Sequence, residues 1–267
     1  MYAIGAFTAE PITVSAYLLG QGMVSSAQLT AHYVNEFADA KVDRLVQHRT
    51  LFSGGSGVIA LGQLTRPVPL AAALITSALT VVLIIFIEPL STAAALLGFL
   101  ALAISWGYSL RPVRLLDTGF GEMTTSAVVT IFVPLVAVSA QGGVASPPLI
   151  WVISSLFPVH LAMMLAFELP DIETDRRAHK TVLAVRMGGA WTRRAIPVLL
   201  SLSALVVAVA VIIGVFDMTA LWVLLATAIP AMLTVRAIGG TRFNVLTTSA
   251  VATLVVLGAG LLATVIL

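Results

Sequence analysis

Two groups of oxygen-bearing side chains stand out in this chain, which is 59% hydrophobic and only 10% charged. Asn35, Asp39 and Asp43 are spaced four residues apart, so on one helix they would project from a single face with a drift of about 40° per step. Asp171 and Asp175 form a second group with the same spacing. Carboxylate and amide oxygens suit Mg²⁺, which usually completes its octahedron with water and substrate phosphates. The residues therefore predict a magnesium site for a phosphate-bearing substrate.

The two groups occupy equivalent places in the two halves of the chain. Asp171 follows Asp39 at the same sequence separation as Asp175 follows Asp43. A parallel duplication of four-helix halves would produce this repeat, with the two groups facing each other across a central cavity. Four aspartates meeting there would repel strongly unless cations lay between them. For either group alone, a solvated loop whose acids pair with nearby Lys and Arg is the alternative, and the repeat favours the metal site.

The elements that position these groups must be membrane helices. The apolar surface of a chain this hydrophobic exceeds what one globular core could bury. Runs of about 18 or more apolar residues are long enough to cross roughly 30 Å of hydrocarbon. They lie near residues 4–31, 67–87, 91–110, 121–139, 147–167, 195–215, 219–236 and 244–266. The expected fold is therefore all-α, a polytopic transmembrane bundle of about eight helices.

The basic residues fall on one side of this predicted bundle. If successive helices alternate in direction, all 14 Lys and Arg residues lie in the segments 32–66, 111–122, 168–194 and 236–243. The other side carries Glu10, Glu88 and Asp217 as its charges. Because cytoplasmic loops carry an excess of Lys and Arg, we expect both aspartate groups at the cytoplasmic face of a bacterial or archaeal plasma membrane. The net charge of +2 then reflects topology, not nucleic-acid binding.

A polar stripe leads along the first predicted helix toward Asn35. Gln21, Ser25, Gln28 and His32 precede it at helical spacings of three and four residues. Leaving such groups unpaired in hydrocarbon costs about 2 kcal/mol or more each. The stripe is therefore expected to face a wet or ligand-filled cavity inside the bundle.

These motifs resemble a known family. The pattern N-x-x-x-D-x-x-x-D at 35–43, followed by "DIETDRRAHKTVLAVRMG" at 171–188, resembles the UbiA superfamily of intramembrane prenyltransferases. The segments "TLFSGGSGVIALGQLTRP" at 50–67 and "YSLRPVRLLDTGFGE" at 108–122 are similar to the family's two other cytoplasmic loops. The resemblance covers nearly the whole chain and implies one integral-membrane prenyltransferase domain over residues 1–267.

The resemblance implies a role for each matching residue. The four aspartates are the expected catalytic set, and with an amide they are expected to hold Mg²⁺ against a prenyl diphosphate: Asn35, Asp39, Asp43, Asp171 and Asp175. A tyrosine and four basic residues are expected to bind the diphosphate itself: Arg66, Tyr108, Arg111, Arg114 and Lys180.

Three departures from the family pattern bear on the acceptor and the fold. His179 stands where many quinone-pathway members have Gly before the lysine. The sequence "FELPD" at 167–171 replaces the Asn-rich motif of naphthoate-type enzymes and is more like homogentisate-type members. Family members typically have nine helices, whereas eight are predicted here, and the family's first helix is expected to be absent.

The expected activity is Mg²⁺-dependent transfer of a prenyl group from a prenyl diphosphate to an aromatic acceptor in lipoquinone biosynthesis. Dihydroxynaphthoate-like and homogentisate-like acceptors are the candidates. A UbiA-type terpene cyclase, with the same metal site and no acceptor, is the alternative. A transporter or channel would instead distribute its charges across the depth of the bilayer, so the clustering at one face disfavours it.

Two histidines stay outside the predicted site. His160 lies within the predicted helix 147–167, where an ionisable residue is a functional candidate. It could take the proton that the acceptor loses, but a hydrogen bond between helices explains it equally well. His179 is interpreted as a titrating surface residue.

Overall fold

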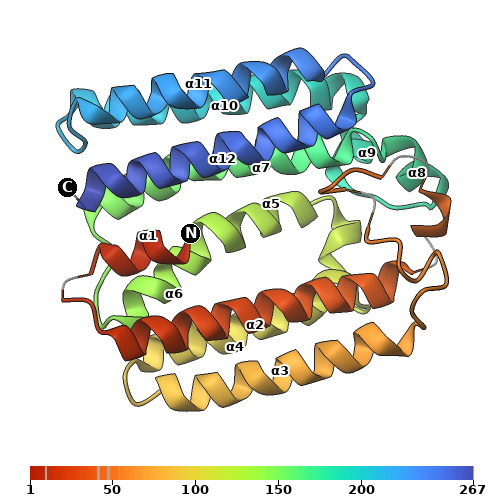
Figure 1. The fold of residues 1–267 in the computed structure, drawn as a ribbon, viewed down its shortest axis with the longest axis horizontal. Helices are drawn as coiled ribbons and strands as arrows, with labels where there is room; N and C mark the ends of the chain where they lie inside the picture. The colour runs from red at the N-terminus through yellow and green to blue at the C-terminus, as the bar shows by residue number, and fades with distance from the viewer. Residues whose placement is uncertain (10, 41–42, 47–48, 54, 267) are drawn as a thin grey trace.

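The structure is a computed structural model that describes residues 1–9, 11–40, 43–46, 49–53 and 55–266 (Figure 1). Within these ranges the chain forms helices joined by loops, and no strand is found. The helices are α1 (Tyr2–Phe7), α2 (Val14–Asp39), α3 (Pro67–Ile87), α4 (Thr92–Ser109), α5 (Gly121–Ala127), α6 (Val133–Ala140), α7 (Pro147–Glu168), α8 (Ile172–Arg177), α9 (Leu183–Met187), α10 (Gly189–Ile212), α11 (Thr219–Ala237) and α12 (Phe243–Ile266).

The predicted transmembrane helices are present. In the described part of the chain, seven helical stretches are long and apolar enough to span a bilayer. One of them, Gly121–Ala140, joins α5 and α6 through a π-helical turn at Val128–Phe132. The 26-residue α2 is also long enough to cross, and its polar stripe makes it less apolar than the other seven. The all-α membrane bundle expected from the sequence is confirmed.

The first predicted helix, 4–31, had the wrong limits. The chain forms the short α1, leaves the helix, and begins α2 only at Val14. Pro11 lies in the break, where its missing N–H and fixed φ disfavour a continuous helix. Gln141 stabilises the segment between α1 and α2. Its Oε1 accepts the Thr13 N–H at 2.8 Å, and its Nε2 donates to the Thr13 carbonyl at 3.3 Å.

Two packed halves make up the bundle. In the first, α2 packs on α3 and α4, and in the second α7 packs on α10 and α12 while α11 packs on α12. Each half has its own buried apolar cluster, around Met23 and Ile84 in one and around Leu156 and Leu257 in the other. Large apolar residues on the outer helices, such as Ile75 of α3 (70% exposed), have only lipid to contact.

The helices alternate in direction, so their ends gather on two sides of the molecule. Figure 1 shows the ends of α2, α4, α7 and α11 and the beginnings of α3, α5, α10 and α12 on the same side as α8 and α9. Both aspartate groups lie on this side. Asp217 and Glu88 lie in the turns on the opposite side, and Glu10 falls outside the described residues.

Candidate functional site

Lys180 lies between the two aspartate groups. Its Nζ is 2.9 Å from Oδ2 of Asp39 and 3.4 Å from Oδ1 of Asp175. All three side chains are largely buried, with exposed fractions of 12%, 6% and 9%. Two groups that are far apart in sequence therefore meet, and a single ammonium ion joins them.

The last turns of α2 hold Asn35 and Asp39 in place. Nδ2 of Asn35 donates to Oγ of Ser109 at 3.2 Å and to Oδ2 of Asp39 at 3.5 Å. Nη2 of Arg114 approaches Oδ1 of Asp39 at 3.5 Å. Both oxygens of Asp39 are thus occupied by donors from three different segments.

Asp43 does not share a helix face with Asn35 and Asp39, so that part of the predicted spacing argument was wrong. Helix α2 ends at Asp39, and Asp43 begins a separate 3₁₀ turn, Asp43–Leu45. The following loop holds it there: Nη2 of Arg49 donates to the Asp43 carbonyl at 2.5 Å. Gly55, at φ +69°, packs so closely on the Asp43 carboxylate that a Cβ there would collide with it. A glycine-containing loop therefore encloses this acid.

The surroundings of Asp43 disfavour its negative charge. Burial raises the pKa of Asp43 to about 6, and the nearby carboxylates of Asp39 and Glu36 add to the effect. Lys180 and Arg49 oppose it. The positive charges of Lys180 and Arg49 therefore do not fully offset burial and the repulsion between the carboxylates around Asp43.

The second group sits where α7 gives way to α8. Asp171 is the residue before α8 and Asp175 lies within it. Burial, and then the neighbouring Asp175, raise the pKa of Asp171 to about 7. Burial also raises the pKa of Asp175, against the attraction of Lys180. Oδ1 of Asp171 is buried and has no hydrogen-bond partner among the described residues.

Lys180 carries the complementary charge. Burial lowers its pKa, but the carboxylates of Asp39, Asp175 and Glu168 raise it by more, so the pKa of Lys180 lies above its ordinary value. The neighbouring carboxylates therefore favour the charged form of Lys180.

Two glutamates near the site, the half-buried Glu168 and the buried Glu122, were not among the predicted site residues. Glu168, at the end of α7, has an Oε2 atom without a partner in the described structure. It lies three residues before Asp171, so the acidic run contained a signal for it. Glu122 is 1% exposed, and its Oε1 accepts the backbone N–H of Leu183 at 2.7 Å. Glu122 is the last residue of the family-like segment 108–122, but no role was predicted for it, because its partner is a backbone group from a distant loop.

Two of the five predicted diphosphate residues, Lys180 and Arg114, contact the acids directly. Arg114 is 22% exposed and pairs with Asp39 and, through Nε, with Oδ2 of Asp117 at 2.5 Å. Tyr108, in the last turn of α4, hydrogen-bonds Thr125 and lies within electrostatic range of Lys180. Arg111 is exposed in the turn after α4, and no described contact links it to the acids.

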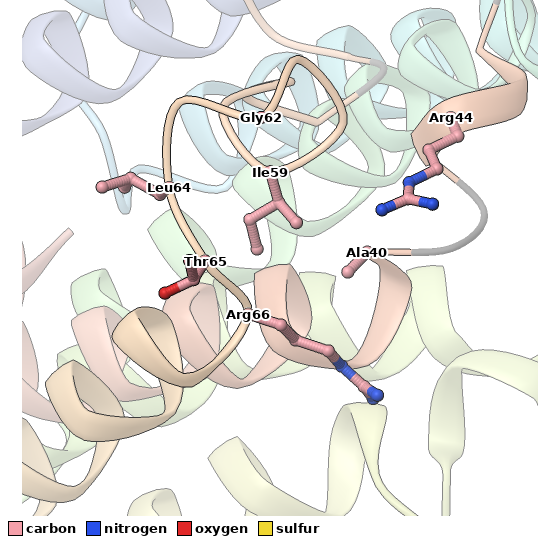
Figure 2. A pocket seen from close by; sticks show the side chains of 7 residues that line it. All are labelled: Ala40, Arg44, Ile59, Gly62, Leu64, Thr65 and Arg66. Carbon is pink, nitrogen blue, oxygen red and sulfur yellow. The ribbon is translucent and has the colours of Figure 1, made fainter.

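Arg66 lies on the other side of α2. Its Nε donates to the Phe37 carbonyl at 3.1 Å, and its guanidinium carbon lies 4.3 Å from the Phe37 ring centroid. Phe37 is two residues from both Asn35 and Asp39, about 200° around the helix from each. Arg66 lines a separate cavity of about 400 Å³. Figure 2 shows it with the other lining residues, Ala40, Arg44, Ile59, Gly62, Leu64 and Thr65.

The two histidines also have defined places. His160 is 4% exposed, and its Nδ1 lies 3.0 Å from Oγ of Ser126 on α5. His160 was interpreted either as a proton acceptor or as a residue that hydrogen-bonds another helix, and the structure shows the hydrogen bond. His179 is exposed and adopts a left-handed conformation, φ 56°, in the turn that leads to Lys180.

The donor set fits a hard divalent cation. In the described ranges, no three His, Cys, Asp or Glu side chains already enclose a metal position. The acids nevertheless converge, include a buried carboxylate oxygen without a partner on Asp171, and have raised pKa values on Asp43 and Asp171. Oxygen ligands of this kind prefer Mg²⁺. The residues present are therefore suited to hold Mg²⁺.

Comparison with known families gives one match over most of the chain. The model of the UbiA prenyltransferase family matches residues 1–253. No curated protein matches the chain.

Solved structures resemble the chain over almost its whole length. The apo structure of a UbiA homolog from Aeropyrum pernix K1 has a TM-score of 0.76 at 18% identity, covering 98% of this chain and 94% of that one. A UbiA homolog from Archaeoglobus fulgidus bound to DMAPP and Mg²⁺ has a TM-score of 0.72 at 16% identity, covering 99% and 93%. A digeranylgeranylglyceryl phosphate synthase has a TM-score of 0.67 at 15% identity, covering 99% and 90%. At these identities the likeness shows a shared fold.

Proposed function

The chain belongs to the UbiA prenyltransferase family, and on that premise we propose that it transfers a prenyl group from a prenyl diphosphate to an aromatic acceptor in lipoquinone biosynthesis. One observation carries the proposal: both aspartate groups meet around Lys180 at one end of an apolar bundle. The single domain spans residues 1–267. The structure of the relative from Archaeoglobus fulgidus, bound to DMAPP and Mg²⁺, supports the same two ligands here.

The acids hold the metal in this proposal. Asn35, Asp39 and Asp43 from the first half and Asp171 and Asp175 from the second provide oxygen ligands at the meeting point. Mg²⁺ in such a site neutralises diphosphate charge and so improves the leaving group.

The tyrosine and basic residues bind the diphosphate oxygens. Lys180 and Arg114 are already at the acids, and Tyr108 lies in the last turn of α4, next to Ser109, which accepts a hydrogen bond from Asn35. Arg111 is on the turn that ends with Arg114, from which its flexible side chain reaches outward. Arg66 contacts the outer face of α2, so its assignment to the diphosphate stays a prediction from the sequence alone.

The bundle excludes water from the reaction. The bond between the first prenyl carbon and the diphosphate oxygen breaks, and the electron pair leaves with the diphosphate. An electron-rich carbon of the acceptor attacks the prenyl cation and then loses its proton. Met163, Met164 and Phe167 lie in the last turns of α7, before Asp171, and belong to the apolar cluster of the second half; in this proposal they shield the cation from water. Phe167 is covered in turn by Phe52, with stacked rings 5.9 Å apart.

The chain is an integral membrane protein, and the site is proposed to face the cytoplasm. The end that carries the acids also carries Arg and Lys residues of the described loops and helix ends, for example Arg114, Arg186 and Arg236. An excess of basic residues marks the cytoplasmic side of a membrane protein.

Product analysis tests the proposal and separates it from the cyclase alternative. Purified protein is incubated with Mg²⁺ and a prenyl diphosphate, with and without dihydroxynaphthoate or homogentisate, and products are identified by mass spectrometry. A prenylated aromatic product supports the proposal. A cyclic hydrocarbon formed from the diphosphate alone would make the protein a terpene cyclase. A glyceryl-phosphate lipid belongs in the same assay as a third acceptor, and transfer to it alone would refute the aromatic acceptor.

A further inference from the structure

Lys180 blocks the acids that the proposed function assigns to the metal. Its ammonium lies between Asp39 and Asp175, 2.9 Å and 3.4 Å from their nearest oxygens. Arg114 contacts the second oxygen of Asp39. While Lys180 and Arg114 contact these oxygens, a divalent cation must compete with them for the carboxylate lone pairs and is repelled by the ammonium and guanidinium charges.

The backbone around Lys180 is fixed. Its own N–H donates to the Asp175 carbonyl at 2.9 Å, and the hydroxyl of Thr181 donates to the Asp117 carbonyl. Two residues further on, the Leu183 N–H donates to Glu122 at 2.7 Å. The position of the loop is therefore set independently of the side-chain ion pairs.

The side chain of Lys180 is the part that can move. It has a flexible four-carbon stem and a compact ammonium that binds any oxygen anion without a fixed orientation. A diphosphate beside Asp39 and Asp175 would offer such oxygens. Lys180 can therefore exchange carboxylate partners for phosphate partners by rotating side-chain bonds, while the loop stays in place.

We propose that Lys180 is an internal counter-ion that keeps Asp39 and Asp175 together and unavailable to a free divalent cation, and that it releases them only when a diphosphate accepts its ammonium. This inference rests on the proposed function, because it takes the same acids as metal ligands. The divalent cation and the diphosphate then bind to the site together. Each should strengthen the binding of the other, since the coupling between two ligands of one site is reciprocal.

Binding of Mn²⁺ tests the inference without any catalytic turnover. Mn²⁺ accepts the same oxygen ligands as Mg²⁺ and gives a paramagnetic resonance signal when free. The wild-type protein and Lys180→Met are titrated with Mn²⁺, with and without inorganic pyrophosphate, and protein-free Mn²⁺–pyrophosphate mixtures are subtracted.

The expected result is a change in coupling. Without pyrophosphate, Lys180→Met should bind Mn²⁺ about tenfold or more tightly than the wild type does, because its acids have lost their counter-ion. Pyrophosphate should strengthen Mn²⁺ binding by about tenfold or more in the wild type and by clearly less in the variant. Equal or weaker Mn²⁺ binding by Lys180→Met would overturn the inference.

Arg176→Met is the matched control. It removes the same charge from the same segment, but Arg176 is 56% exposed and pairs only with Glu173 at 3.2 Å. Its Mn²⁺ affinity should stay within about twofold of the wild-type value, because exposed charges are screened by salt. An equal gain in Lys180→Met and Arg176→Met would reduce the effect to net charge and reject the inference.

Two further outcomes keep the test decisive. If Lys180→Met does not fold, the wild type alone gives the answer, since Mn²⁺ binding that does not respond to pyrophosphate contradicts the coupling. If neither protein binds Mn²⁺ with or without pyrophosphate, the metal site of the proposed function fails. Mn²⁺ binding that is independent of Lys180 leaves the proposed function intact and refutes this inference alone.

Discussion

Asp39 makes more polar contacts than its neighbours in the site. It accepts from Lys180 and Asn35 through Oδ2 and from Arg114 through Oδ1, and it is only 4% exposed. Its negative charge therefore organises two cations and an amide in addition to its proposed metal contact. Residues on α2, on the turn after α4 and in the loop between α8 and α9 all contact this one carboxylate.

Replacing Asp39 by Asn tests its charge while keeping its shape. We expect Asp39→Asn to lower kcat/KM for prenyl transfer by about 100-fold or more, because a buried group that organises the transition-state charge is lost. Glu173→Gln is the control, since Glu173 is 60% exposed and pairs with Arg176 and Arg177 at the surface. Steady-state rates with Mg²⁺ and a prenyl diphosphate measure both. Near-normal turnover of Asp39→Asn would remove it from the metal site.

The sequence predicted this part of the site well only where the helix is regular. Asn35 and Asp39 lie on the same face of α2, one turn apart, and their side chains are in contact. Their four-residue spacing therefore predicted their relative position correctly. The same rule failed for Asp43, because α2 ends before it and a loop contact from Arg49 decides its position. Glu122 could not be predicted at all, because it binds a backbone N–H whose location depends on the tertiary fold.

At the scale of elements, Arg114 and Arg66 contact opposite faces of α2. Arg114 reaches the inner face, where it contacts Asp39, and Arg66 binds the Phe37 carbonyl on the outer face. We expect Arg114→Gln to raise the KM for prenyl diphosphate by about tenfold or more, because a charge-assisted contact to phosphate is lost. Arg66→Gln should have a clearly smaller effect on the same KM.

Substrate titrations of the two variants check this difference. A rise in KM that is larger for Arg66→Gln would mean that the loop before α3 reorganises to bring Arg66 to the diphosphate. The family pattern would then have been the better guide than the geometry of α2.

The contact between Glu122 and Leu183 ties α5 to the loop that carries Lys180. Glu122→Ala leaves the Leu183 N–H without its buried acceptor, which costs about 1 to 3 kcal/mol of stability. We expect this variant to unfold at lower temperature and to have a higher KM for prenyl diphosphate, because Lys180 is less well placed. Glu122→Gln keeps an accepting oxygen and should recover most of both properties. Thermal unfolding and KM of the two variants, compared side by side, decide whether the acceptor oxygen or the charge matters.

Apolar runs predicted the long helices because length and hydropathy alone suit an element to the bilayer. They did not predict the break before Val14 or the short α8 and α9, since these depend on Pro11, on Gln141 and on contacts at the loops. The start of α10 at Gly189 was also missed, because Arg193 and Arg194 interrupt the apolar run without interrupting the helix.

At the scale of the whole molecule, one end is charged and the other nearly neutral. The acids, Lys180 and the basic loops gather at the end with α8 and α9 (Figure 1), while the turn at Asp217 lies at the other. We infer the orientation in a membrane from this asymmetry, because Lys and Arg are retained on the cytoplasmic side. The repeat of the two aspartate groups predicted that both would lie at the same end, since each follows a helix running in the same direction.

Cysteine labelling tests this orientation on an unmodified background, because the chain contains no Cys. Met218, 66% exposed in the turn before α11, and Thr241, exposed in the turn before α12, lie at opposite ends. In intact cells we expect a membrane-impermeant maleimide to label Met218→Cys and to label Thr241→Cys only after lysis. The reverse pattern would place the acids outside the cell. A water-soluble prenyl acceptor made in the cytoplasm could not then reach them, so the labelling constrains the acceptor as well as the topology.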